Sequence, residues 1–107
     1  MKLGIIISQT NPETVWNAFR LANFAIAQGD EVEVFLVGEG VEYEMSSSEK
    51  FNIQEQTAEF LKSDKAQIQA CGTCLKSRKQ EATNTCPMNT MEDLYTLVQG
   101  CDKILTF

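Results

Sequence analysis

The opening segment, residues 1–37, constrains the fold most, because a strand, a helix and a second strand follow one another there without interruption. Residues 3–7 are a short apolar run, and Val32, Val34 and Leu36 alternate within a second apolar segment. Roughly twenty residues connect the two segments, which is enough for a helical crossover between parallel strands, and such crossovers are almost always right-handed. The sequence therefore predicts an α/β fold with a parallel sheet.

Standard signals mark the two ends of the connecting helix. Asn11 is a good N-cap residue, and Pro12 suits the first helical position. Gly29 follows the last apolar position and ends the helix. The residues between them repeat at the spacing of one helix face: Val15, Phe19, Ala22 and Ile26.

The middle of the chain contains a segment without periodicity, followed by a second helix and strand. Residues 38–50 are acidic and rich in serine, so we expect an exposed loop. Asn52 and Glu55 resemble a capping box. The helix that they begin would carry on its inner face Ile53, Thr57, Phe60 and Leu61. Residues 66–70 are predicted to form a third strand with glutamines on one face, which indicates a wet position or a face covered by another subunit.

The last part of the chain predicts one more helix and strand. Thr90 and Asp93 form a second capping pattern, and Gly100 ends the helix. The apolar positions of that helix are Met91, Leu94, Leu97 and Val98. Residues 103–107 form the closing strand, and one short strand falls near residues 85–88. The whole pattern predicts a single domain over residues 1–107, a three-layer α/β/α sandwich with a mainly parallel sheet of four or five strands.

Composition excludes several classes of function. The net charge of −6 argues against nucleic-acid and membrane-surface partners, which need a basic surface. Histidine is absent, so Ser-His-Asp and Cys-His catalysis and Cys2His2 zinc sites are excluded. No apolar run is long enough to span a membrane, and no signal-peptide pattern opens the chain. We therefore expect a cytoplasmic protein whose four cysteines are mostly reduced.

The candidate site is the stretch "ACGTCLKSRK", residues 70–79. Cys71 follows the third strand and Cys74 falls in the first turn of the next helix, at the sheet edge where parallel α/β folds place their chemistry. Three cations follow: Lys76, Arg78 and Lys79. The helix dipole and these charges should lower a thiol pKa. In this arrangement the first cysteine is expected to be the exposed nucleophile and the second its buried partner.

Other interpretations of the cysteines remain open at this point. Both residues of the pair would also suit simple packing, because cysteine behaves as a small apolar residue. A zinc site would need Cys86 and Cys101 as further ligands, but this second pair lacks the close spacing of a zinc knuckle. Cys101 is expected to be structural, and Cys86 is a candidate third redox residue. No glycine-rich phosphate loop is present, and we expect neither a cofactor nor a bound metal.

The chain resembles the DsrE/DsrF-like family, most closely its small YchN-like members, which are related to the sulfur-relay proteins TusD and DsrE. The segments that carry the resemblance are "KLGIIIS", "FLVGEGV", "FNIQEQTAEFL", "ACGTCLKSR" and "CDKILTF". The resemblance implies a parallel α/β fold and assembly as a homotrimer or homohexamer. It also implies a persulfide on the cysteine after the third strand, which is Cys71 here. Cys74 matches a second cysteine of the YchN-like subgroup. Lys79 replaces a usual glycine, and Cys86 is an addition.

The function expected from the resemblance is that of a small sulfur carrier or sulfurtransferase. Cys71 would take up sulfur from a donor protein and pass it to an acceptor protein. One alternative is a dithiol–disulfide oxidoreductase, in which Cys74 resolves a mixed disulfide on Cys71. Another alternative is a non-catalytic oligomeric binding protein.

Overall fold

The computed structural model describes residues 1–78 and 88–107. In chain order its elements are β1 (Lys2–Ile7), α1 (Pro12–Ala27), β2 (Glu31–Leu36), the 3-10 helix η1 (Gly38–Ser46), α2 (Ile53–Phe60), β3 (Ala66–Cys71), α3 (Gly72–Ser77), β4 (Met88–Asn89), α4 (Met91–Gly100) and β5 (Lys103–Thr106).

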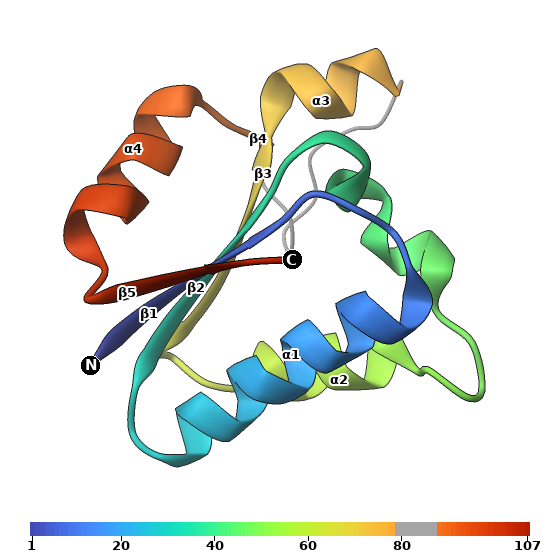
Figure 1. Ribbon diagram of the computed structural model, residues 1–107, viewed down its shortest axis with the longest axis horizontal. Coiled ribbons are helices and arrows are strands. Elements are labelled where there is room, and N and C mark those ends of the chain that lie inside the picture. Colours follow the sequence, from blue (N-terminus) through green and yellow to red (C-terminus); the bar gives the residue numbers. More distant parts are fainter. Residues whose placement is uncertain (79–87) are drawn as a thin grey trace.

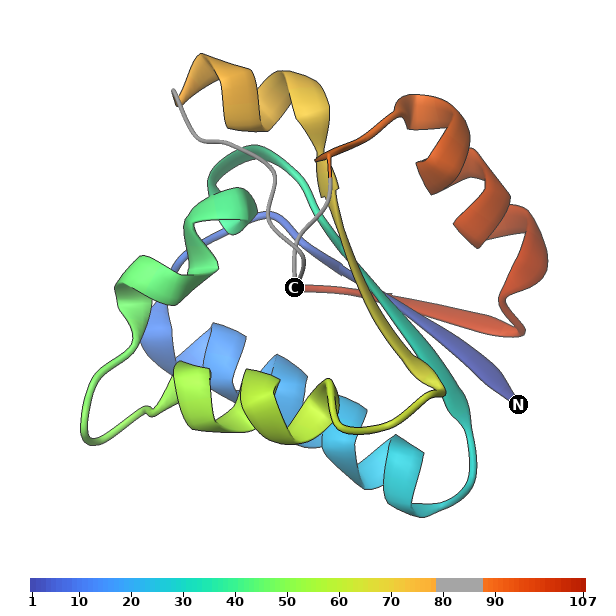
Figure 2. The same cartoon turned by 180° about the vertical axis from the view of Figure 1, so that it is seen from behind.

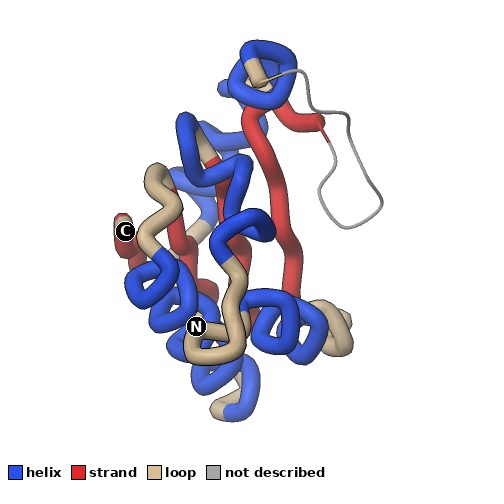
Figure 3. Tube along the Cα trace, turned by 90° about the vertical axis from the view of Figure 1, so that its right-hand side faces the viewer, coloured by secondary structure: helices blue, strands red, loops and turns tan. Residues whose placement is uncertain are grey.

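The strands form one sheet in the order β4-β3-β2-β1-β5, and every neighbouring pair is parallel. Helices α1 and α2 cover one face of this sheet and α4 lies on the other, as Figures 1 and 2 show from opposite sides. Helix α3 lies beyond the carboxyl end of β3 (Figure 3). These observations confirm the predicted three-layer α/β sandwich with a parallel sheet.

Two apolar clusters hold the layers together. The larger one fills the space between the sheet and helices α1 and α2. There the Phe19 and Phe60 rings pack edge to face, with their centroids 5.9 Å apart. The smaller one lies under α4 and contains Phe35, Cys71 and Leu97. The first cysteine of the pair is therefore part of a packed cluster.

The predicted helix caps are present. The side chain of Asn11 accepts a hydrogen bond from the backbone N–H of Thr14 at 3.0 Å. The Asn52 side chain accepts one from the N–H of Glu55 at 2.9 Å. Thr90 caps α4 in a complete capping box with Asp93. Each cap satisfies a backbone donor that the first helical turn leaves without a partner.

The prediction of an exposed loop over residues 38–50 is wrong for residues 38–46, whereas residues 47–50 lie outside any helix or strand and residues 48–50 are exposed. Residues Gly38–Ser46 form η1, and Gly40, Val41 and Tyr43 are buried. The Tyr43 ring packs against Phe19 at 5.7 Å between centroids. Burial of these side chains stabilises the segment although its sequence has no helical periodicity.

The predicted inner face of the last helix is only partly correct. Leu97 is buried and Leu94 is half-buried, whereas Met91 is 58% exposed and Val98 44% exposed. Helix α4 touches the sheet along a narrow line, where Leu97 packs over Gly4. A side chain at Gly4 would place its Cβ 2.8 Å from the Leu97 side chain, so glycine permits this close approach.

Candidate thiol site

The two cysteines of the CxxC motif lie together at the carboxyl end of the sheet. Cys71 is the last residue of β3 and the N-cap of α3, and Cys74 is the third residue of that helix. Both are free thiols. The placement of the motif at a strand–helix junction, predicted from the sequence, is confirmed.

The expected exposure of the two thiols is reversed. Cys71 is only 5% exposed, whereas Cys74 is half-buried. The side chain of Cys71 points to the α4 face of the sheet, where it packs with Phe35 and Leu97. The prediction of an exposed first cysteine and a buried second one is wrong, because strand alternation directs Cys71 into this cluster.

A chain of hydrogen bonds connects the site to the segment after β2. The backbone N–H of Gly38 donates to Sγ of Cys74 at 3.2 Å. The thiol of Cys74 in turn hydrogen-bonds to Cys71, which also accepts from the backbone N–H groups of Thr73 and Cys74. Within this arrangement Cys71 receives donors only, whereas Cys74 both receives and donates.

The two thiols have different acidities as a result. Burial raises the pKa of Cys71. The backbone N–H and thiol of Cys74 and the backbone N–H of Thr73 donate hydrogen bonds that lower it. These donors outweigh burial, so the pKa of Cys71 lies below the ordinary value for cysteine. Burial and the hydrogen bond to Cys71 raise the pKa of Cys74, although the N–H of Gly38 and the charge of Arg78 oppose this. The geometry therefore favours a thiolate on Cys71 and a neutral thiol on Cys74.

The three predicted cations differ in what they contact. Lys76 is exposed at the surface of α3. Arg78 forms an ion pair with Glu42 of η1, with Nε and Oε1 3.5 Å apart, and donates from Nη1 to the carbonyl oxygen of Cys74 at 3.3 Å. Lys79 lies outside the described residues, as does Cys86. Of the two candidate cations within the described residues, Arg78 contacts the cysteine pair, through the carbonyl of Cys74.

Gly38 and Glu42 belong to this site, and sequence reasoning missed both. The lack of periodicity and the many charges of this segment predict an exposed loop instead. The signal that identifies them is topological. Strand β2 is the neighbour of β3, so the residue after β2 emerges beside the residue after β3.

The third described cysteine, Cys101, lies in the small cluster under α4 and is half-buried. Its burial, and then the nearby carboxylate of Glu33, raise its pKa above the ordinary value. These surroundings favour a neutral thiol. Among residues 1–78 and 88–107, no cluster of three or more potential ligands suits a metal ion. The four-cysteine zinc alternative also needs Cys86 and stays a hypothesis.

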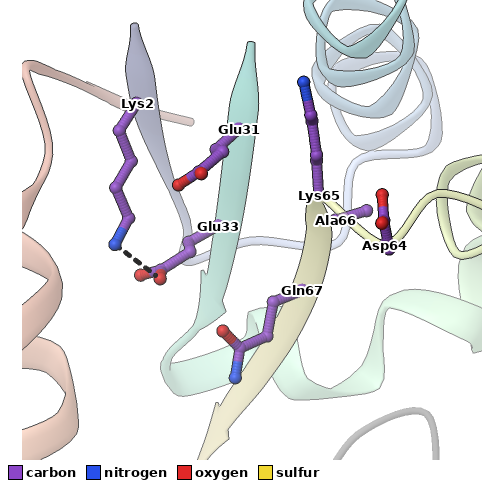
Figure 4. Close-up of a pocket in the computed structure, with 7 residues that line it drawn as sticks. All are labelled: Lys2, Glu31, Glu33, Asp64, Lys65, Ala66 and Gln67. Carbon is purple, nitrogen blue, oxygen red and sulfur yellow. Dashed lines mark ion pairs between the residues drawn. The ribbon is translucent and has the colours of Figure 1, made fainter. Parts of the chain in front are cut away.

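A separate hollow of about 510 Å³ lies at the amino-terminal ends of β1, β2 and β3. Figure 4 shows its lining, which is polar and includes the Lys2–Glu33 ion pair, with Nζ and Oε1 3.1 Å apart. The residues around it are Lys2, Glu31, Glu33, Asp64, Lys65, Ala66 and Gln67. None of the cysteines that the structure describes lines this hollow, so it is distinct from the thiol site at the opposite end of the sheet.

Helices in the described ranges are all too short or too polar to cross a lipid bilayer.

Two archaeal proteins are similar to this chain over nearly its full length. An uncharacterised protein of Methanocaldococcus jannaschii is 30% identical over 115 residues, with all of both chains covered. One from Methanopyrus kandleri is 28% identical over 113 residues, covering 98% of this chain and 93% of the relative. Their names assign no activity.

Solved structures share the fold. The ychN protein from Escherichia coli superimposes with a TM-score of 0.82 at 23% identity, with both chains fully covered. A conserved protein of unknown function from Bacteroides thetaiotaomicron gives a TM-score of 0.80 at 24% identity, covering 99% of this chain and 94% of that one. The DsrE/DsrF-like family matches residues 1–107. The chain therefore belongs to the DsrE/DsrF-like family.

Proposed function

We propose that this protein is a cytoplasmic sulfur carrier that holds sulfane sulfur as a persulfide on Cys71. Membership of the DsrE/DsrF-like family supports a role of the sulfur-relay type. The observation that carries the proposal is the set of donors around Cys71, which comprises two backbone N–H groups and the Cys74 thiol. These donors stabilise the thiolate, and the thiolate is the nucleophilic form of cysteine.

The proposed uptake step balances without a cofactor. The Cys71 thiolate attacks the terminal sulfur of a persulfide on a donor protein. A bond forms between that sulfur and Sγ of Cys71, the donor's S–S bond breaks, and the donor cysteine leaves as a thiolate. An acceptor protein's thiolate then removes the terminal sulfur from Cys71 in the same way.

The burial of Cys71 suits a carrier. Any accessible thiolate can attack a persulfide. Cys71 is only 5% exposed, so its burial reduces the loss of bound sulfur to small thiols in solution. We assign the cations Lys76, Arg78 and Lys79 to attraction of the anionic persulfide or of the partner that brings it. Of these, Arg78 is in contact with the site through the carbonyl of Cys74.

A dithiol–disulfide oxidoreductase is the second candidate. The hydrogen bond between the thiols of Cys71 and Cys74 favours it, because the second thiol is already within reach of the first. In that case Cys71 attacks a substrate disulfide, and Cys74 then displaces the reduced substrate. The same geometry serves both chemistries, so variants must separate them.

Intact mass spectrometry after incubation with a cysteine desulfurase and cysteine tests the proposal. Each sulfane sulfur adds about 32 Da to the thiol protein. We expect this addition in the wild type and in Cys74→Ser, and no addition in Cys71→Ser. For an oxidoreductase, Cys74→Ser would instead trap mixed disulfides with substrate. A wild type that gains no sulfur but turns over in a disulfide-reduction assay contradicts the carrier.

We also propose that the protein works as a homotrimer or homohexamer. Apolar side chains on the outer face of α4 support this, with Met91, Tyr95 and Val98 exposed by 58%, 62% and 44%. A second copy against this face would cover the apolar stripe. Light scattering that returned a monomer at micromolar concentration would contradict the assembly.

A further inference from the structure

The turn between β2 and η1 is held rigidly against the carboxyl end of the sheet. Gly38 has φ of +55°, a left-handed conformation that favours glycine. Gly40 packs so tightly that a Cβ there would clash with the carbonyl oxygen of Ile7. The N–H of Gly40 also donates to the carbonyl of Val37 at 2.9 Å. The direction of the Gly38 N–H is therefore set by the fold.

That N–H donates to Sγ of Cys74 at 3.2 Å, a contact between residues 36 positions apart. Among residues 1–78 and 88–107, the charged and titratable groups that face Cys74 are Cys71, on the same strand–helix junction, and Arg78, which pairs with Glu42 of η1. Segment 38–42 thus supplies a direct hydrogen bond to the second thiol and also pairs with the positive charge of Arg78 beside it.

We propose that the backbone N–H of Gly38 is a positioning group, which holds Cys74 as the thiolate that expels sulfane sulfur from Cys71 as hydrosulfide. This inference rests on the proposed carrier function. It adds a second outcome for bound sulfur: besides transfer to an acceptor, the site reduces it with its own dithiol.

The step balances with the two cysteines alone. Sγ of the Cys74 thiolate attacks Sγ of the persulfidated Cys71, and a Cys71–Cys74 disulfide forms. The bond from Cys71 to the terminal sulfur breaks, and this sulfur leaves as HS⁻ with the electron pair and the proton that Cys74 loses on becoming a thiolate. The sulfane sulfur is reduced to sulfide, and the two cysteines are oxidised to the disulfide. An external thiol reductant then restores the dithiol for the next cycle.

The hydrogen-bond pattern explains why the Gly38 N–H matters after loading. In the unloaded site the Cys74 thiol donates a hydrogen bond to the Cys71 thiolate. Once Cys71 carries sulfur, its Sγ is no longer an anion and that bond weakens. The Gly38 N–H remains as a direct donor to Cys74, and a donor to the charged form stabilises it.

Proline scanning at two left-handed glycines tests the inference. Gly38→Pro removes the backbone N–H donor. Gly38→Asn keeps this N–H, and asparagine tolerates a positive φ. Gly29→Pro is the matched control. Gly29 has φ of +93° and donates to the carbonyl of Ile26 at 3.0 Å, so this variant loses a comparable hydrogen bond at the other end of the sheet.

Each protein is loaded with sulfur and the decay of the persulfide is followed without an acceptor. Release should appear as free sulfide together with a disulfide form about 2 Da lighter than the dithiol. Gly38→Pro should still load and should release sulfide roughly tenfold more slowly, because loss of this donor lowers the fraction of Cys74 present as thiolate. Gly38→Asn should restore most of the rate, and Gly29→Pro should match the wild type.

The outcomes separate this inference from the carrier proposal. Absence of loading in Cys74→Ser, which cannot release sulfide by this step, overturns the carrier function itself. Loading without sulfide release and disulfide formation overturns only the inference, and so does an unchanged release rate in folded Gly38→Pro.

Nuclear magnetic resonance provides a second test if Gly38→Pro does not fold. In Cys71→Ser, the amide proton of Gly38 should shift as Cys74 ionises, and this step should disappear in the Cys71→Ser/Cys74→Ser double variant. An amide resonance that does not respond to ionisation of Cys74 overturns the inference.

Discussion

Arg78 and Glu42 form an ion pair, with Nε and Oε1 3.5 Å apart, that joins α3 to η1 beside Cys74. The two side chains are 27% and 33% exposed, so water screens their attraction and little stability depends on it. The consequence of the pair is instead positional. It keeps a positive charge near Cys74. That charge lowers the pKa of Cys74 and so opposes the increase that burial causes.

Arg78→Gln should raise the pKa of Cys74, because the favourable charge is lost. The pH midpoint for alkylation of Cys74, measured in a Cys71→Ser background, checks this without coupled titration. The free energy of unfolding should fall by less than about 1 kcal/mol. Lys62→Gln is the control, since Lys62 forms an exposed ion pair with Glu59 at the C-terminal end of α2, with Nζ and Oε2 2.9 Å apart. An Arg78→Gln midpoint equal to that of the parent protein would contradict the assignment.

The alkylation of the wild type should show opposite shifts at the two thiols. Cys71 should reach its half-maximal rate below the pH of an ordinary cysteine, and Cys74 above it. Peptide mapping by mass spectrometry identifies each site. The low exposure of Cys71 reduces its maximal rate but not its midpoint. Cys101 should also titrate high, which makes it an internal reference. A lower midpoint for Cys74 than for Cys71 would reverse the proposed roles.

The same shifts set the sign of the pH dependence of stability. The depressed pKa of Cys71 stabilises the folded state at pH values above the pKa of an unfolded cysteine, and this contribution is lost as pH falls through its folded-state value. The raised pKa of Cys74 stabilises the folded state at pH values below the pKa of an unfolded cysteine. This stabilisation is lost as pH rises through the folded-state pKa of Cys74. Urea unfolding of Cys71→Ser and Cys74→Ser across this range should therefore give opposite slopes relative to the wild type.

Gly4→Ala should destabilise the protein by about 1–3 kcal/mol, because the new methyl group would overpack the contact between β1 and α4. The added Cβ would lie 2.8 Å from the Leu97 side chain and 3.1 Å from Sγ of Cys101. Chemical denaturation measures the change. Gly100→Ala is the control, since its nearest neighbour would be the flexible Lys2 Nζ at 3.8 Å. Equal stability of the two variants would contradict close packing under α4.

Tyr95→Glu should weaken or abolish the proposed oligomer, because it places a charge in the centre of the exposed stripe on α4. Phe24→Glu provides the comparison, since Phe24 is 64% exposed on α1 and Tyr95 is 62% exposed. Light scattering should give a smaller mass for Tyr95→Glu alone. Dissociation by Phe24→Glu and not by Tyr95→Glu would place the interface on the α1 face.

Local signals predicted the elements closely. Asn11 and Gly29 delimit α1, and Thr90 with Asp93 begins α4, because caps and left-handed turns depend on residues within one helical turn. The apolar runs predicted parallel strands, because a crossover of this length leaves few other topologies. The same reasoning placed the CxxC motif at the carboxyl end of β3.

Long-range packing decided what these signals did not contain. Periodicity failed for η1, whose buried Val41 and Tyr43 depend on neighbours far along the chain. It also overestimated the burial of Met91 and Val98, because a helix pattern does not reveal how wide a face the sheet offers.

The sequence by itself determined the α/β fold, the parallel direction of its strands and the location of the two thiols, since each follows from local propensity and chain connectivity. Only the tertiary structure decided which thiol is buried and which group activates it. Cys71 lies under α4, and Cys74 meets the N–H of Gly38, because neighbouring parallel strands bring distant segments to the same edge of the sheet. Acidity depends on those distant donors and on burial, and neither can be read from the spacing of two cysteines.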